Sequence, residues 1–165
     1  MPYTRKGFSL VEVLVAISVL LLAVTGTLTV ASRSIALSIG AQDQVTASFL
    51  AEEVLEFVRN TRDNNLLSGN AWFDDLESCV GVGKKCVIDV PNNTVSECLD
   101  DCPTIRLSGG GVYNYSLGDS TIFRRETTIE EVIPDREAII RVSMFWKRKL
   151  LEKNFTVEEN LFNWQ

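Results

Sequence analysis

The N-terminal part of the chain carries a long apolar run that follows two positive charges. Residues 8–31 are apolar or small apart from Glu12, and no further charged residue occurs before Arg33. A helix that crosses the hydrocarbon core of a bilayer needs about 20 residues. The pattern therefore predicts a membrane-spanning helix over residues 8–32 that contains one carboxylate, Glu12, close to its start.

A conventional cleaved secretory signal is the alternative interpretation of this run. Such signals have an apolar stretch of about 7–15 residues that ends at a cleavage site of small residues. Ala23 and Gly26 resemble that site, but the apolar pattern continues past them through Leu28 and Val30. The length of the run therefore favours a retained helix.

After the span, the hydrophobic pattern changes from all-round to one-sided. Apolar residues recur at the i, i+3, i+4, i+7 spacing of an amphipathic helix. They are Ala47, Leu50, Ala51, Val54, Phe57 and Val58. No proline occurs between Pro2 and Pro91, so nothing forces an early break. We therefore expect one continuous helix from Phe8 to about Asn60.

Beyond this helix, the chain is first rich in turn residues and then rich in β-forming residues. The predicted strands are residues 86–90 and 112–117 in the turn-rich middle, and 120–133, 136–146 and 155–164 near the C-terminus. The last three strands would form an antiparallel meander, with Ile140, Val142, Met144 and Trp146 on one face. We predict an α+β fold, in which the long N-terminal α-helix packs on a C-terminal antiparallel β-sheet.

Charge predicts the orientation and limits the partners. Arg5 and Lys6 precede the span with no acid near them, which predicts a cytoplasmic N-terminus and an exported remainder. The chain has a net charge of −6, and without residues 1–7 it keeps 14 Lys+Arg against 22 Asp+Glu. This balance disfavours broad nucleic-acid binding without excluding a local basic patch. Residues 146–149, Trp-Lys-Arg-Lys, are interpreted as a charged hairpin turn, with DNA contact as the alternative.

All four cysteines lie in the part predicted to be exported: Cys79, Cys86, Cys98 and Cys102. Disulfides are the default outside the cytoplasm, and four thiols allow three pairings. The sequence-local pairs, Cys79–Cys86 and Cys98–Cys102, are favoured because this segment lacks a strong apolar pattern and needs cross-links. A four-thiolate zinc site is an alternative, although the first spacing departs from the usual gap of about two to four residues. Free structural thiols are the other alternative.

Little in the sequence indicates catalysis. The chain has no histidine, which removes the commonest general base and the Ser-His and Cys-His nucleophile systems. A two-carboxylate hydrolase stays open, but no spacing places two acids in a common pocket. The acid pairs Asp74–Asp75 and Asp100–Asp101 lack the spacing of a calcium loop and are interpreted as solvated turns. We expect no catalytic residue, no metal site and no cofactor.

The leader and the start of the span together resemble a known signal. Arg5 and Lys6 are followed by Gly7, Phe8 and a Ser-Leu-Val-Glu segment that ends at Glu12, and then by the long apolar run. This arrangement is similar to the class III signal peptide of type IV pilins and type II secretion pseudopilins. The resemblance implies a pilin-like fold for the chain.

The resemblance also implies a processing route. Prepilin peptidase, a membrane-embedded aspartic protease, would cut between Gly7 and Phe8, and the new Phe8 amine would be N-methylated. The Glu12 carboxylate would then pair with the Phe8 amine of an adjacent subunit and set the axial stagger, as a polar core residue fixes register in a coiled coil. The alternative role for Glu12 is to favour the helix dipole at the wet membrane boundary.

Residues 49–63, which begin Phe-Leu-Ala-Glu-Glu, resemble the lower helix of PilV-like and pseudopilin I-like minor subunits. This resemblance implies a structural minor pilin or pseudopilin. Its partners would be other pilin or pseudopilin subunits, prepilin peptidase and the assembly platform in the membrane. The alternatives are a filament-displayed receptor or adhesin that binds DNA or a surface, and a membrane-anchored enzyme.

The predicted organisation follows from these points. Residues 1–7 are the cytoplasmic leader, 8–32 the transmembrane and assembly helix, 33–60 its amphipathic continuation, and 61–165 the exported β-rich head. The protein would be single-pass in the cytoplasmic membrane, with its N-terminus inside and its head outside. It would later move to an extracellular or periplasmic filament.

Overall fold

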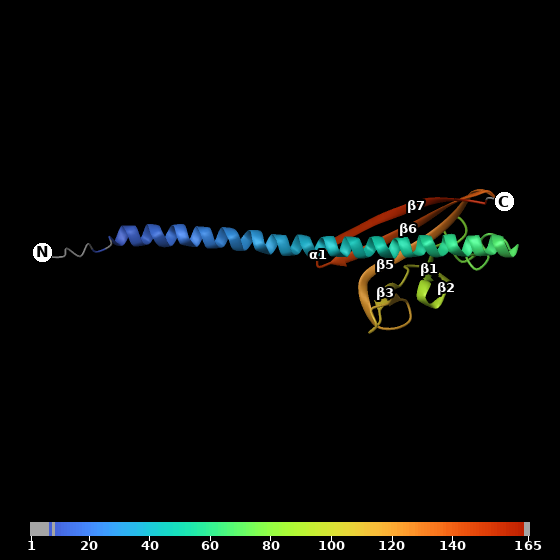
Figure 1. Cartoon of the computed structure of the whole chain (residues 1–165), viewed down its shortest axis with the longest axis horizontal. Coiled ribbons are helices and arrows are strands. Elements are labelled where there is room, and N and C mark those ends of the chain that lie inside the picture. The colour runs from blue at the N-terminus through green and yellow to red at the C-terminus, as the bar shows by residue number, and fades with distance from the viewer. Residues whose placement is uncertain (1–6, 8, 164–165) are drawn as a thin grey trace. The chain divides into compact units, whose positions relative to one another are not determined.

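The structure is a computed structural model that describes residues 7 and 9–163 of the chain. These residues form one long helix, α1 (Leu10–Ser68), one short 3-10 helix, η1 (Val90–Asn92), and a single seven-stranded sheet. The strands are β1 (Cys86–Asp89), β2 (Thr94–Glu97), β3 (Thr104–Leu107), β4 (Tyr113–Asn114), β5 (Asp119–Ile133), β6 (Glu137–Arg148) and β7 (Leu151–Phe162) (Figure 1). The chain divides into two compact units, Met1–Val45 and Thr46–Gln165.

Within the first unit, the described residues from Leu10 to Val45 all belong to α1. Their large apolar side chains are exposed along the whole segment, from Leu10 to Val45. α1 is the one helix among the described residues that is long and apolar enough to cross a membrane. The predicted continuity of the early helix is confirmed.

In the second unit, the remainder of α1 packs on the sheet through one apolar stripe. Most of the predicted stripe is buried, Phe57 is half-buried, and Leu55 joins the buried set. The sheet contributes the face of β6 that was predicted: Ile140, Val142, Met144 and Trp146 are all buried. Burial alternates along β6, as expected for a strand with one face on the core. The predicted α+β arrangement of helix and sheet is confirmed.

The sheet is built around the long strand β5. One edge of β5 pairs with β6 along most of its length, and β6 pairs in turn with β7, so that β5, β6 and β7 form the predicted antiparallel meander. The other edge of β5 pairs with β3 and β1 at different points. β4 and β2 then extend the sheet beyond β3 and β1. All these strand pairs are antiparallel.

The expected three-stranded sheet with an irregular middle is therefore too small. β1 and β4 overlap the two short strands that the sequence predicted in the middle, whereas β2 and β3 were not predicted. Each of these two strands has four residues, and the side chains of β2 are mostly exposed, so neither carries an alternating apolar pattern. They are held by pairing with neighbouring strands, which is a tertiary effect.

α1 also continues past the predicted end near Asn60 and stops at Ser68. The added turns are anchored because the buried Asn65 side chain donates to the backbone carbonyl of Asp74, at 2.8 Å. The helix ends at Gly69, whose φ of 74° fits the left-handed residue that commonly follows a helix. The Gly69 N–H donates to the carbonyl of Leu66, at 3.2 Å. Asn and Asp residues in the segment weakened the helix prediction, but tertiary contacts outweigh their propensity.

Candidate functional site

The first candidate site is the apolar surface of α1 in the first unit. Its large side chains point to the outside of the unit without a covering element, and nine of them are more than 60% exposed. These are Leu10, Val11, Val19, Leu20, Leu22, Leu28, Val30, Ile35 and Leu37. An uncovered apolar helix surface of this length is unfavourable in water, so it needs lipid or other helices around it.

Hydroxyl groups within this apolar surface are satisfied by the helix itself. Each of five serine and threonine side chains donates to a backbone carbonyl three or four residues earlier. These bonds are Ser18 to Leu14 (2.8 Å), Thr25 to Leu21 (2.8 Å), Thr27 to Val24 (3.0 Å), Thr29 to Thr25 (2.8 Å) and Ser32 to Leu28 (3.0 Å). The hydroxyls therefore need no water, and the surface they lie on behaves as an apolar one.

Glu12 lies in the first turn of α1 and is exposed. It is the one acid before Asp43. Gly7, the residue before the predicted cleavage point, is described and exposed. Arg5, Lys6 and Phe8 lie outside the described residues, so cleavage, methylation and the pairing of Glu12 with an amine stay predictions.

A buried arginine joins helix and sheet in the second unit. Arg125, on β5, is only 2% exposed. Its Nη1 donates to the carbonyl of Leu50 at 2.6 Å and to the Glu53 carboxylate at 3.1 Å, and its Nη2 donates to the carbonyl of Ile88 at 2.7 Å. One side chain thus connects α1, β5 and β1. Arg125 was not among the predicted site residues, because an arginine in a strand usually faces solvent.

Tyr115 lies beside this arginine. The Arg125 guanidinium carbon is 5.8 Å from the centroid of the Tyr115 ring. Burial raises the pKa of the Tyr115 hydroxyl above its ordinary value of 10.0, and the positive charge of Arg125 opposes that rise. The pair is a structural junction between the strand region and the helix, and it holds no reactive group close to an open cleft.

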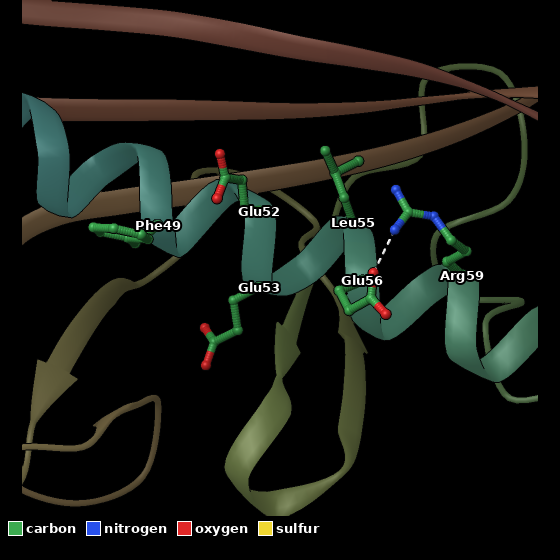
Figure 2. A pocket seen from close by; sticks show the side chains of 6 residues that line it. All are labelled: Phe49, Glu52, Glu53, Leu55, Glu56 and Arg59. Atoms are coloured by element: carbon green, nitrogen blue, oxygen red, sulfur yellow. Dashed lines mark hydrogen bonds and ion pairs between the residues drawn. The ribbon is translucent and has the colours of Figure 1, made fainter.

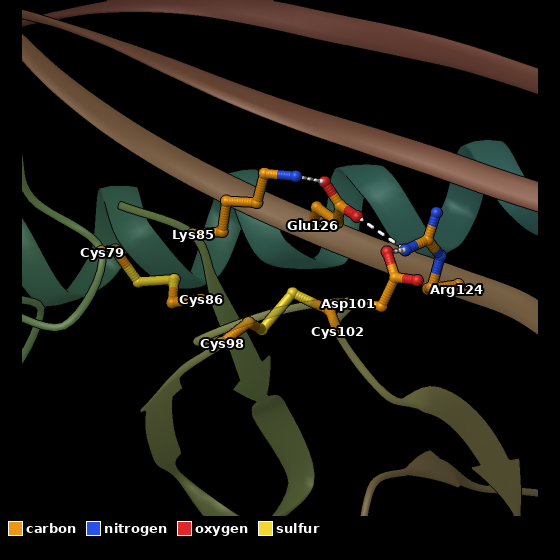
Figure 3. Close-up of a disulfide and its surroundings, with 8 residues drawn as sticks. All are labelled: Cys79, Lys85, Cys86, Cys98, Asp101, Cys102, Arg124 and Glu126. Carbon is orange, nitrogen blue, oxygen red and sulfur yellow. Dashed lines mark hydrogen bonds and ion pairs between the residues drawn. A yellow bond between two sulfur atoms is a disulfide. The ribbon is translucent and has the colours of Figure 1, made fainter. Parts of the chain in front are cut away.

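All four cysteines form disulfides, Cys79–Cys86 and Cys98–Cys102. The structure therefore has the sequence-local pairing, and no cysteine is free for zinc or for a thiol role. Cys79 and Cys86 are fully buried, so the first disulfide belongs to the core. Figure 3 shows both disulfides close to β5.

A charged cluster lies beside the disulfides. The nearly buried Glu126 carboxylate accepts from Lys85 at 3.0 Å and from Arg124 at 2.9 Å. Arg124 also bonds Asp101 at 2.6 Å, in the loop that the Cys98–Cys102 disulfide closes (Figure 3). The acid pair Asp100–Asp101, considered for calcium, therefore contributes a carboxylate to an arginine. The cluster fastens this loop to the sheet.

An open hollow on α1 is lined by side chains of that helix alone: Phe49, Glu52, Glu53, Leu55, Glu56 and Arg59 (Figure 2). Two of its three carboxylates already have partners, because Glu56 bonds Arg59 and Glu53 bonds Arg125. Arg59 also reaches Glu159 on β7, at 2.7 Å. The hollow is thus a surface depression in which most charged side chains already have partners.

No group of three or more residues suited to hold a metal ion occurs among the residues that the structure describes. At the other acid pair, the Asp74 carboxylate accepts from the backbone N–H of Ala71 at 3.2 Å, as in a local turn. Trp146 of the basic segment is only 4% exposed and packs near Phe123 and Phe155. Its ring is therefore not available to stack on a nucleic-acid base, which weakens the DNA alternative.

The comparison with known families supports the signal at the N-terminus. Residues 3–28 match the prokaryotic N-terminal methylation motif, and the matched range includes Gly7, Phe8 and Glu12. No curated protein and no solved structure shows significant similarity to the chain. The motif is that of type IV pilin-like precursors, which prepilin peptidase processes, and it indicates a structural protein. With the exposed apolar helix, it is consistent with a precursor anchored in the inner membrane. The motif at residues 3–28 supports assigning the chain to the superfamily of type IV pilins and type II secretion pseudopilins.

Proposed function

We propose that the chain is a minor pilin or pseudopilin, a structural subunit that joins a type IV pilus-like filament through its N-terminal helix. Residues 1–7 would be the leader, 8–32 the membrane and assembly helix, 33–60 its continuation, and 61–165 the displayed head. The single observation that carries this proposal is the uncovered apolar surface of α1 with one acid, Glu12, in its first turn. The methylation motif over the same residues supports it.

The proposed assembly chemistry uses the two ends of one short segment. Cleavage between Gly7 and Phe8 gives Phe8 a positive α-amine, which lies about 6 Å along the helix from Glu12. An ionised group at mid-bilayer costs about 2.5–3.5 kcal/mol. When helices pack together and exclude lipid headgroups and water, the Glu12 carboxylate of one subunit and the Phe8 amine of the next compensate each other. The pairing would fix the stagger between subunits.

Orientation and partners follow from the same proposal. Arg5 and Lys6 would keep the leader in the cytoplasm, where prepilin peptidase and the assembly platform act on it. Other pilin or pseudopilin subunits would supply the neighbouring helices. Minor status rests on the resemblance of residues 49–63 to PilV-like and pseudopilin I-like subunits.

Intact-mass analysis of the membrane-extracted protein tests the processing step. We expect a chain that begins at Phe8, with the mass of one added methyl group and a deficit of about four hydrogens from two disulfides. The same preparation after reduction should gain these hydrogens. A chain that retains its first seven residues would show that the proposed processing is wrong.

A substitution tests the assembly role of Glu12. Glu12→Gln keeps the shape of the side chain and removes its charge, so we expect normal membrane insertion and cleavage but loss of incorporation into filaments. Glu52→Gln, on the exposed surface of α1 in the second unit, is the matched control and should assemble normally. Equal amounts of both variants in sheared filament fractions would contradict the proposed pairing.

A further inference from the structure

The turn between β6 and β7 exposes both apolar and basic side chains. β6 ends at Arg148 and β7 begins at Leu151, so Lys149 and Leu150 form the connection. Leu150 is 96% exposed and Leu151 is 71% exposed. Residues 147–153 contain four cations and one acid, a net charge of +3, in a chain whose total is −6. The remaining residues therefore carry −9, and the turn is a basic, apolar tip on an acidic protein.

The turn lies at the end of the second unit where α1 enters it. Arg59 bonds Glu159, and the Arg62 Nη1 donates to the carbonyl of Phe162 at 2.9 Å, so β7 and α1 run in the same direction. Going back from Glu159 to Leu151 covers about 26 Å of strand. Going back from Arg59 to the start of the unit covers about 20 Å of helix. The β6–β7 turn is therefore level with the first turn of α1 in this unit.

The sequence just before the unit extends the apolar character of the span. Between Arg33 and Asp43 there is no charged residue, and Ile35, Leu37 and Ile39 are exposed in the first unit. The long side chain of Arg33 can bury its aliphatic part in lipid and place its charge at a headgroup, so Arg33 does not end the apolar segment. The first acid after Glu12 is Asp43, which is only three residues before the second unit begins. A bilayer surface between Ser32 and Asp43 would lie between about 21 Å and about 5 Å before the start of the second unit, measured along α1.

We propose that the β6–β7 turn is an interfacial anchor that binds the anionic lipid headgroups of the bilayer that holds α1. Leu150 and Leu151 would insert at the level of the headgroups, and Lys149 and Lys153 would contact their phosphates, whereas Lys147 already bonds Glu152 at 2.7 Å. Such sites combine apolar insertion with electrostatic attraction. The proposal rests on membrane anchoring by α1 and not on filament assembly, so it concerns the subunit before it leaves the bilayer.

Charge favours a lipid surface over the other occupants of such a tip. The acidic remainder of the chain is repelled by an anionic surface, so only one end of the head is attracted and its orientation is defined. A nucleic acid would use an aromatic ring, but Trp146 is buried. A second copy of this chain would have to cover both leucines. The hollow on α1, with Phe49 at one end, is a poor receptor for them, because its arginine is already partnered by Glu56 and Glu159.

The test uses the full chain in lipid nanodiscs and measures backbone hydrogen exchange in residues 147–153. With phosphatidylglycerol present, we expect exchange near Leu150 to slow roughly tenfold relative to phosphatidylcholine alone, because one or two lysines contribute attraction of that size. Added salt should reverse the effect. The double variant Lys149→Gln/Leu150→Ser should lose it.

The control is Lys84→Gln/Leu99→Ser, which removes one exposed lysine and a leucine that is 92% exposed elsewhere on the head. It should exchange like the unchanged chain. Unaltered exchange in β5 shows that each variant is folded. Equal exchange in the two lipids would overturn the proposal, and so would protection that follows protein copies per disc instead of lipid charge. Failure of membrane anchoring by α1 would be seen separately, as chain lost from the discs.

Discussion

Arg125 brings a full positive charge to a position that water hardly reaches. A buried charge is costly unless hydrogen bonds and an opposite charge compensate it. Here, two backbone carbonyls and the Glu53 carboxylate accept from the guanidinium group. The carbonyls of Leu50 and Ile88 come from a helix and a strand that are far apart in sequence. Arg125 therefore fixes how α1 lies on the sheet, beyond what apolar contact specifies.

We predict that Arg125→Met lowers the free energy of unfolding by about 3 kcal/mol, because two buried carbonyls lose their donors. Thermal unfolding in detergent, followed by near-ultraviolet circular dichroism, measures the change. Arg106→Met is the control. Arg106 also donates to a carbonyl, that of Gly118 at 3.0 Å, but it is exposed, and its loss should cost less than about 0.5 kcal/mol. A similar loss of unfolding free energy in the two variants would show that Arg125 does not hold α1 on the sheet.

Tyr115 makes the stability of the head sensitive to alkaline pH. Its pKa is raised by burial above 10.0, so above this pH the unfolded chain loses a proton that the folded chain keeps. Stability should then fall by about 1.4 kcal/mol per pH unit until the folded-state pKa is reached. Below pH 10 this contribution is fully present.

The Tyr115→Phe variant isolates the effect. Its unfolding free energy should lack this component of the alkaline decline, so the difference between the variant and the unchanged chain should grow in favour of the variant above pH 10. Chemical unfolding at a series of pH values measures the difference. A constant difference across the series would exclude Tyr115 as the titrating group.

At the scale of elements, the loop between α1 and β1 is held by a covalent link and by strand-like contacts. The Cys79–Cys86 disulfide closes this loop inside the core. Beside it, the Ile129 N–H donates to the carbonyl of Cys79 at 2.9 Å, and the Gly81 N–H donates to the carbonyl of Ile129 at 3.0 Å. The Cys98–Cys102 disulfide lies in a loop that is more exposed, with Leu99 uncovered between its ends.

The two disulfides should therefore differ in their contribution to stability. Loop closure alone gives about 2–2.5 kcal/mol for each, because both loops are short. Replacing Cys79 and Cys86 by alanine should cost about 1 kcal/mol more than replacing Cys98 and Cys102, since both cysteines of the first pair are buried, whereas only Cys102 is buried in the second. Thermal unfolding of the two double variants measures this order. The reverse order would mean that the Cys98–Cys102 loop contributes more to the core than its exposure indicates.

Sequence patterns predicted the elements whose signals are long and periodic. α1 as far as Asn60 and the three long strands each carry a hydrophobic pattern of many residues, whereas the last turns of α1 contain Asn and Asp, which hide the helix signal. β2 and β3 carry no such pattern, and their pairing partners are determined only when the chain is folded. In the candidate site, Glu12 and the cleavage motif could be predicted from the sequence, because the motif is defined by the order and spacing of its residues. The Arg125 junction was not, because it depends on which carbonyls the fold brings together.

At the scale of the whole molecule, the proposed topology predicts that the two leader cations control export of the head. An alkaline phosphatase domain fused after Gln165 should be active in cells, because the head would be exported. Exchanging both leader cations, Arg5→Glu with Lys6→Glu, should reduce that activity by weakening retention of the N-terminus in the cytoplasm. Lys84→Glu with Arg136→Glu, at two exposed positions in the exported part, is the control and should leave the activity unchanged. Full activity with the reversed leader would contradict the assigned orientation.

β7 pairs with β6 alone among the described residues, so one side of this twelve-residue strand has no neighbour. A bare strand of that length is a template on which other chains could add. Between Glu152 and Asn160 its exposed side chains are all polar, and they include Glu152 and Glu158, so an identical chain docking there would bring like charges together. We expect this arrangement to prevent amyloid-like growth of the sheet during export. Ordered polymerisation is then left to the helical part of the molecule.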